Sequence, residues 1–175
     1  MAKDQPSGAR DDSQGLSKEE LRRRAIIAKQ LSSAFGDIVS LLMRSESERS
    51  RALADLEWMV IPALQTGQFA VAEGQSKETG MVSPMGAVLW AMVSDEVDQR
   101  ISSQLDKPLK LQQSEWRSGE IPWIVAAFGD PKVVGQLLEE LSKNVFKQRS
   151  AKLRSRGEDG KAFVGKLEFK PAQTS

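Results

Sequence analysis

The apolar residues between Leu21 and Leu42 recur at the spacing of one face of an α-helix. Ser17 and Glu20 precede this pattern in the order of a capping box, in which each side chain accepts a hydrogen bond from the backbone N–H of the other residue. A helix is therefore predicted to begin at Ser17. Gly36 lies inside the pattern and is predicted to bend this helix or to split it in two.

Three further helices are predicted farther along the chain. The first covers 52–60, and Pro62 should end or bend it because the residue before a proline avoids the helical region. The second covers about 95–104. The third begins at Asp130-Pro131, where aspartate can cap the helix and proline suits its first position.

Strands are predicted where Val, Ala, Phe, Met and Trp are concentrated between turn-forming residues. Segments 68–73 and 81–93 flank the turn-like stretch 74–80 and predict a β-hairpin. Later strands are predicted near 113–117, 123–128, 145–154 and 161–169. Helices first, then a hairpin, then mixed elements indicate an α+β domain with a largely antiparallel sheet and helices packed against it.

Composition favours one globular domain, because 39% hydrophobic residues in a chain of 175 can build one core of ordinary size. We place this domain at 17–170, between a polar, disordered leader at 1–16 and a flexible tail at 171–175. Every apolar run, Met59 to Leu64 among them, is far shorter than the roughly 20 residues that a bilayer crossing needs, so no transmembrane segment is expected. Residues 1–18 lack the apolar region of a secretory signal.

The chain contains no histidine and no cysteine. These absences remove the side chain that most often serves as a general acid or base, and they remove the thiolate nucleophile and the common zinc ligands. No metal site and no bound cofactor is expected. The lack of cysteine also fits a cytoplasmic protein.

Charge is unevenly distributed along the chain, whose overall net charge is +1. Segment 143–170 holds nine basic and three acidic residues, a net charge of +6, so the rest of the chain carries −5. Such a basic surface could attract an acidic partner, and a solvated surface without a partner is the alternative.

Two groups of side chains are candidates for chemistry. Glu46 and Glu48 stand two residues apart in the polar stretch 45–51, so an extended loop would point both carboxylates the same way as an acid–base pair; the alternative is a set of solvated charges balanced by neighbouring arginines. Four tryptophans could line an apolar groove for an acyl chain, and core packing is their commoner role: Trp58, Trp90, Trp116 and Trp123.

Five short segments in one order carry a resemblance to a known family. They are Leu56 to Ala70 (LEWMVIPALQTGQFA), Trp90-Ala91 with Val93-Ser94, Trp116-Arg117-Ser118-Gly119-Glu120, Phe128-Gly129-Asp130, and Asp159-Gly160-Lys161 with Val164-Gly165-Lys166. Together they resemble the RTX-toxin-activating lysine acyltransferases over about residues 34–169.

The resemblance implies a fold and a reaction. The family's fold is similar to that of the GNAT acetyltransferases, and its members move a fatty acyl group from acyl carrier protein to an internal lysine of an RTX protoxin in the cytoplasm. The implied partners are thus acyl carrier protein and the protoxin, with a homodimer as a further expectation and no nucleic acid. Acyl carrier protein is acidic, and a basic face that includes Arg149, Arg154 or Arg156 would suit it.

The resemblance also implies where the catalytic groups would lie. Counting back without gaps from Pro62 places Glu48 at the position of the family's histidine. The family's aspartate has no counterpart, because the stretch Trp123 to Phe128 is about three residues shorter than the family's and holds no acid.

These departures leave three hypotheses open. In the first, Glu48 replaces the histidine in an active acyltransferase. In the second, the chain keeps the fold and binds an acylated carrier or a client protein without turnover. In the third, it is a small adaptor that has no part in acyl chemistry.

Overall fold

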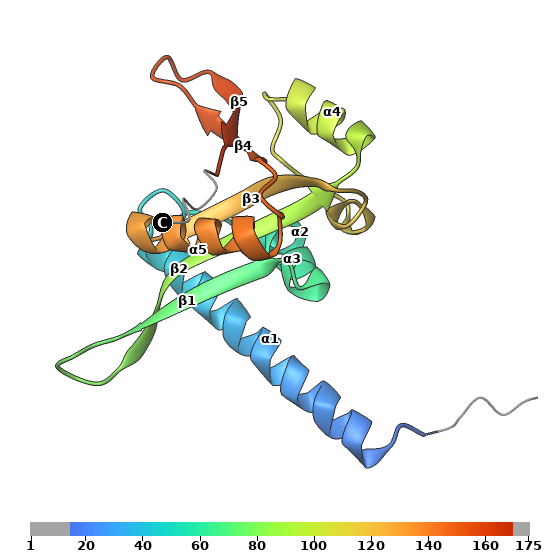
Figure 1. Ribbon diagram of the computed structural model, residues 1–175. Coiled ribbons are helices and arrows are strands. Elements are labelled where there is room, and N and C mark those ends of the chain that lie inside the picture. The colour runs from blue at the N-terminus through green and yellow to red at the C-terminus, as the bar shows by residue number, and fades with distance from the viewer. Residues whose placement is uncertain (1–14, 170–175) are drawn as a thin grey trace, which may run out of the picture.

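The computed structural model describes residues 15–169, so the expected tail and nearly all of the expected leader lie outside it. The chain folds into a five-stranded sheet with helices on both faces (Figure 1). In chain order the elements are α1 (Lys18–Arg44), the 3₁₀ turn η1 (Leu53–Asp55), α2 (Leu56–Met59), α3 (Ile61–Thr66), β1 (Phe69–Gln75), β2 (Val82–Val93), α4 (Asp95–Ser103), the 3₁₀ turn η2 (Gln113–Trp116), β3 (Ile121–Gly129), α5 (Pro131–Asn144), β4 (Ala151–Arg156) and β5 (Ala162–Leu167).

The sheet order is β1-β2-β3-β4-β5, and every pairing except β3 with β4 is antiparallel. α5 connects the two parallel strands, as a crossover connection requires. This architecture confirms the predicted α+β class with its mostly antiparallel sheet. The likeness to the GNAT acetyltransferases stays a prediction.

β2 shows how the sequence builds two cores from one strand. Successive side chains of a strand point to opposite faces, and residues 87–91 of β2 are all buried. Ala87 and Leu89 pack with α1, α2 and α3 in the larger core, whereas Val88 and Trp90 pack with α5 in the smaller one. A continuous apolar run is therefore what a strand covered on both faces requires.

α1 begins as predicted, with a complete capping box between Ser17 and Glu20. It is one continuous helix, so the predicted bend or break at Gly36 is wrong. By length and composition it is, within residues 15–169, the one helix that could cross a membrane. Its buried residues, Ala34, Ile38, Leu41 and Leu42, all belong to the larger core, and a core helix passes the same test of length and composition.

Of three other predicted elements, one agrees with the structure and two differ. The helix predicted at 52–60 is η1 followed by α2, and it ends at Met59, before Pro62, as predicted. Pro62 itself lies in the first turn of α3, where its missing N–H costs nothing. The segment predicted as a strand near 113–117 is η2, which buries Trp116. β4 begins at Ala151 and not at 145. The residues between α5 and β4 form a hydrogen-bonded turn, in which Phe146 packs edge-on against Trp90 with ring centroids 6.2 Å apart.

Candidate functional site

The two parallel strands of the sheet stay together for only two residue pairs. Trp123 pairs with Lys152 and Ile124 with Leu153, and then β3 and β4 diverge. At the same point β3 contains a bulge: Leu89 of β2 pairs with Ala126 and Trp90 pairs with Ile124, so Val125 between them has no partner. Bulges are frequent beside active sites, because they redirect side chains and end pairing.

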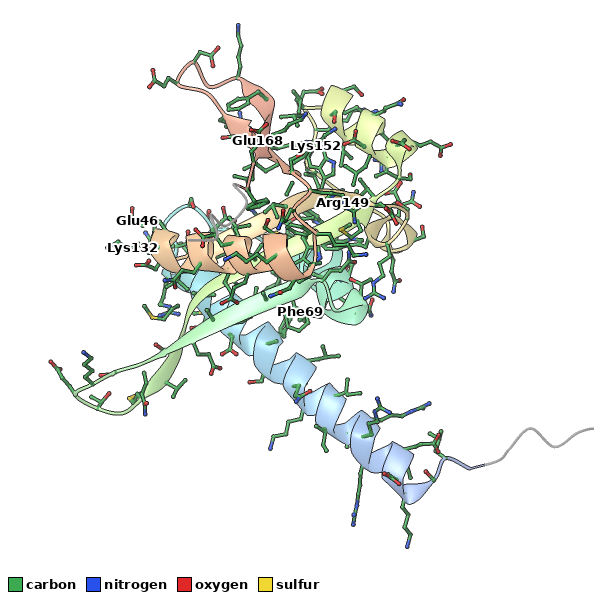
Figure 2. The ribbon with its side chains drawn as sticks, in the orientation of Figure 1. Glu46, Phe69, Lys132, Arg149, Lys152 and Glu168 are labelled. Carbon is green, nitrogen blue, oxygen red and sulfur yellow. The ribbon has the colours of Figure 1, made fainter. Side chains whose placement is uncertain are left out.

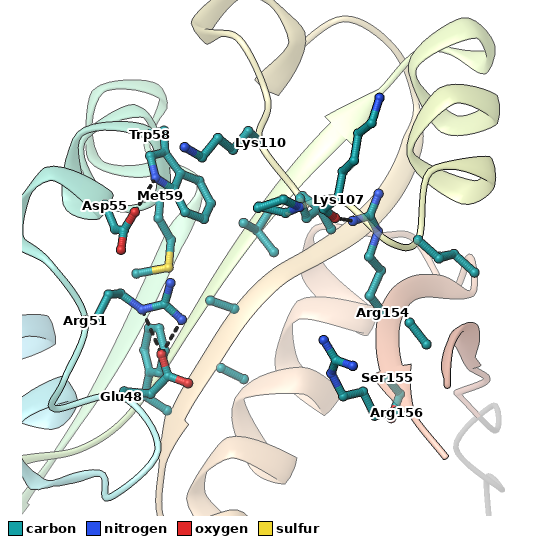
Figure 3. Close-up of a pocket in the computed structure, with 18 residues that line it drawn as sticks. Glu48, Arg51, Asp55, Trp58, Met59, Lys107, Lys110, Arg154, Ser155 and Arg156 are labelled. Carbon is teal, nitrogen blue, oxygen red and sulfur yellow. Dashed lines mark hydrogen bonds and ion pairs between the residues drawn. The ribbon is translucent and has the colours of Figure 1, made fainter. Parts of the chain in front are cut away.

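A groove of about 560 Å³ lies over this divergence (Figure 3). One wall comes from the loop after α1 together with η1 and α2, the floor from β3, and the other wall from β4 with the loop after α4. The residues that line it are Glu48, Arg51, Asp55, Trp58, Met59, Leu105, Lys107, Pro108, Leu109, Lys110, Val125, Ala126, Ala127, Phe128, Arg154, Ser155, Arg156 and Ala162.

Glu48 stands on the first wall in a turn that follows α1. The amides of Glu48 and Arg49 both donate to the Ser45 carbonyl, at 3.2 and 2.9 Å, which fixes the turn. The Nε of Arg51 donates to Oε2 of Glu48 at 2.8 Å, and a second guanidinium nitrogen donates to the same oxygen. The Glu48 side chain is 22% exposed, and within residues 15–169 no side chain donates to its Oε1, which leaves that oxygen for a ligand.

Asp55 and Trp58 stand on the same wall. The indole Nε1 of Trp58 donates to Oδ1 of Asp55 at 3.0 Å, and the Lys110 ammonium lies 5.2 Å from the centre of the indole ring. A cation over an aromatic face is attracted by the ring quadrupole, so this contact draws the loop after α4 toward α2. It closes one end of the groove (Figure 3).

Arg154 holds the opposite wall together. Its Nε and one terminal nitrogen donate to the carbonyl of Ile101, at 3.1 and 2.6 Å, and the other terminal nitrogen donates to the carbonyl of Lys107 at 2.6 Å. Burial, and secondarily repulsion by Arg100, lowers the pKa of Arg154 below its ordinary value. Arg154 therefore ties β4 to the end of α4, where a cation also complements the helix dipole.

The groove is basic. Arg51, Lys107, Lys110, Arg154 and Arg156 line it against two carboxylates, Glu48 and Asp55. A basic concave surface concentrates acidic ligands and accelerates their encounter.

Comparison with known proteins agrees with this geometry. The sequence model of the RTX toxin acyltransferase family matches residues 27–166. The chain belongs to this family. It is 25% identical over 120 residues to the lysine-acyltransferase RtxC of Vibrio cholerae serotype O1, which covers 67% of the chain and 71% of that relative. It is 23% identical over 133 residues to the uncharacterized protein sll0720 of Synechocystis, which covers 74% of the chain and 84% of that relative.

The groove belongs to the part of the chain that the family shares, because every residue that lines it lies within the matched region. The chain is an RTX toxin acyltransferase-like protein, and an RTX protoxin is the substrate class that the family implies. Glu48, which the resemblance places at the family's histidine, lines the groove. Val125 to Phe128 form its floor.

The structure separates the other predicted candidates. Glu46 is exposed and lies outside the groove, because the loop turns at these residues and is not extended, so the pair with Glu48 does not form (Figure 2). Trp90, Trp116 and Trp123 are buried in the cores, and Trp58 alone of the four tryptophans reaches the groove.

The three arginines of the predicted basic face do not all lie in the groove. Arg154 and Arg156 line the groove, whereas Arg149 lies outside it (Figure 2) and pairs with Glu120 at 2.9 Å. The Nη1 of Arg156 donates to the Gly160 carbonyl at 3.1 Å, which braces the turn between β4 and β5.

Sequence reasoning missed the groove residues of the loop after α4 and missed one junction beside the groove. Asp98 of α4 accepts hydrogen bonds from the Trp123 indole at 2.7 Å and from the Lys152 ammonium at 2.8 and 2.7 Å. Trp123 and Lys152 are the first of the two parallel pairs, so Asp98 fastens α4 to both strands where they still meet. No motif could reveal this contact, because Trp123 and Lys152 are 25 and 54 residues from Asp98 in the sequence.

Proposed function

We propose that this chain transfers a fatty acyl group from acyl carrier protein to an internal lysine of an RTX protoxin. The observation that supports the proposal is the placement of Glu48 in a basic groove at the point where β3 and β4 diverge. The family match covers this region, and the basic wall suits an acidic carrier.

In the proposed reaction the amine nitrogen of the target lysine attacks the thioester carbonyl carbon. The new C–N bond replaces the C–S bond, the carrier leaves as a thiolate that takes up a proton, and the amine loses the proton that Glu48 accepts through Oε1 or a water. A solvated carboxylate is a weak base toward a lysine ammonium. Much of the rate therefore has to come from holding amine and thioester together.

The test compares two glutamates that lie two positions apart. Purified chain is incubated with acyl-loaded carrier protein and an RTX protoxin, and acyl-lysine is counted by mass spectrometry. Glu48→Gln should lower the rate by about 10²- to 10⁴-fold, the usual contribution of a positioned base. Glu46→Gln is the matched control, because Glu46 is exposed and outside the groove. Equal rates for Glu48→Gln and the parent would eliminate this role.

A second candidate function is binding of the acylated carrier or of a client protein without turnover. The ion pair between Glu48 and Arg51 favours it, because Arg51 already occupies Oε2 of that carboxylate with two hydrogen bonds. The floor residues Val125 to Phe128 also supply no acid. Saturable binding of acyl carrier protein in calorimetry, with no acyl-lysine formed, would establish this function and exclude the first.

A further inference from the structure

The N-terminal half of α1 projects from the body of the protein (Figure 1). Every residue from 15 to 30 is exposed, and the first buried residue of the helix is Ala34. The family match begins at residue 27, so the first turns of α1 precede the region that the family shares. Neither the core nor the groove uses this part of the helix.

This projecting segment, residues 18–30, is both apolar and basic. Leu21, Ile26 and Ile27 are 53%, 59% and 46% exposed. Five basic residues stand among them against Glu19 and Glu20, a net charge of +3 for the segment: Lys18, Arg22, Arg23, Arg24 and Lys29. Figure 2 shows that the side chains along this part of α1 reach outward, and within residues 15–169 no other helix or strand lies beside it.

A helix that carries large apolar side chains into water is marginal on its own, because most helical stability in proteins comes from packing one apolar face. The combination of exposed apolar side chains with clustered arginines is typical of helices that lie in the interface of an anionic membrane. Arginine stems can also cover apolar surface while their charged ends stay in the headgroup region.

The arrangement favours a membrane over a second protein helix. Ile26 and Ile27 are adjacent, so their side chains point about 100° apart around the helix. Arg23 lies between Ile26 and Ile27 on the helix and Leu21 lies on the other side, so the apolar side chains form no narrow stripe that one partner helix could cover. On a lipid surface the arginine stem can lie beside the two isoleucines while its charged end stays among the headgroups. A second copy of this helix would in addition bring two arginine clusters to the same contact.

We propose that the segment 18–30 of α1 docks the protein on an anionic membrane surface, with Ile26 and Ile27 in the interface and its arginines on the lipid headgroups. The docked helix would hold the groove close to the membrane. This inference is independent of the acyl transfer proposed above, and its test measures lipid binding only.

The experiment is flotation of the full chain with vesicles of phosphatidylcholine, alone or mixed with phosphatidylglycerol. The protein should float with the mixed vesicles and stay behind with the neutral ones, and high salt should release it because screening weakens the attraction. The triple variant Arg22→Glu/Arg23→Glu/Arg24→Glu should weaken partitioning more than about tenfold. Ile26→Ser/Ile27→Ser should weaken it without any change in charge.

The matched control reverses three exposed lysines elsewhere, Lys132→Glu/Lys143→Glu/Lys166→Glu, and should float nearly as the parent does. Equal loss in the control would mean that overall charge and not α1 is responsible, and the proposal would fail. It would also fail if the parent does not float with anionic vesicles, or if the arginine variant abolishes self-association in sedimentation but leaves flotation unchanged. The variants should keep the acylation rate of the parent, so a failure here is separable from a failure of the transferase proposal.

Discussion

Replacing Asp98 by asparagine should destabilise the protein at the junction of α4, β3 and β4. The Asp98 side chain is 13% exposed and that of Lys152 is 24% exposed, so solvent screens this pair only partly. The asparagine oxygen can still accept the Trp123 indole N–H, but the attraction to the Lys152 ammonium at 2.7 Å is lost. A hydrogen bond to a charged group contributes about 1.5–3 kcal/mol, and we expect a loss of that size.

Urea denaturation followed by tryptophan fluorescence measures this loss, with an unchanged dependence on urea as the check for two-state unfolding. The matched control is Asp95→Asn, which also removes a carboxylate from the first turn of α4 but at an exposed position. The control subtracts the helix-dipole contribution, which is typically about 0.3–1 kcal/mol. If Asp98→Asn costs less than about 0.5 kcal/mol more than Asp95→Asn, the junction does not hold the strands as argued.

A second pair of variants tests the same contact from the apolar side. Asp98→Leu leaves both the Lys152 ammonium and the buried Trp123 N–H without their hydrogen-bond acceptor. It should lower the free energy of unfolding by about 3–5 kcal/mol. Adding Lys152→Met should recover a large part of that cost, because an ion pair replaced by apolar groups of similar volume is often neutral. Failure of the double variant to recover stability would mean that Asp98 acts on something other than Lys152.

Three further predictions follow from local geometry. Gly129→Ala should cost more than about 3 kcal/mol in urea denaturation, because Gly129 has φ +104° and an added Cβ would lie 2.2 Å from the carbonyl oxygen of Met85; a loss under about 1 kcal/mol would contradict this. Asp130→Ala should cost about 1 kcal/mol in the same assay through loss of the α5 N-cap, and Asp130→Asn should keep most of it. Hydrogen bonds from the backbone and side chain of Ser17 lower the pKa of Glu20 below its ordinary value of 4.5. The cap is therefore complete above pH 4.5 and is lost as the pH falls through the lowered pKa of Glu20, so the Ser17 amide resonance should titrate below pH 4.5 in the parent and stay fixed in Glu20→Gln.

Local signals predicted the elements that are governed by local physics. The capping box at Ser17, the Asp130-Pro131 start of α5 and the hairpin of β1 and β2 all depend on residues close in sequence, and the structure contains all three. The predictions failed where distant packing decides. Trp116 is buried in a 3₁₀ turn against the Gln68 side chain, whose amide donates to the Trp116 carbonyl at 2.9 Å across 48 positions of sequence.

The groove shows the same division. Glu48 could be placed by counting along a family resemblance, but its ion pair with Arg51 depends on the local turn. The basic wall opposite Glu48 comes from residues about 60 to 110 positions later in the sequence. No sequence pattern marked the loop that carries Lys107 and Lys110, because its place in the groove depends on the direction in which the chain runs after α4. The bulge at Val125 is invisible in sequence, since it is defined by the register with β2.

The positive charge of the groove would make the incoming lysine easier for a weak base such as a carboxylate to deprotonate. Five basic residues and two carboxylates surround the site, so a lysine that enters as an ammonium meets a net positive potential. Like charges disfavour the protonated form and lower the pKa of the incoming amine. The same basic residues that would attract an acidic carrier would thus also help to expose the neutral amine that attacks the thioester. In the proposed reaction Arg156 and Lys107 would therefore assist Glu48, because they shift the equilibrium of the incoming lysine toward its neutral amine.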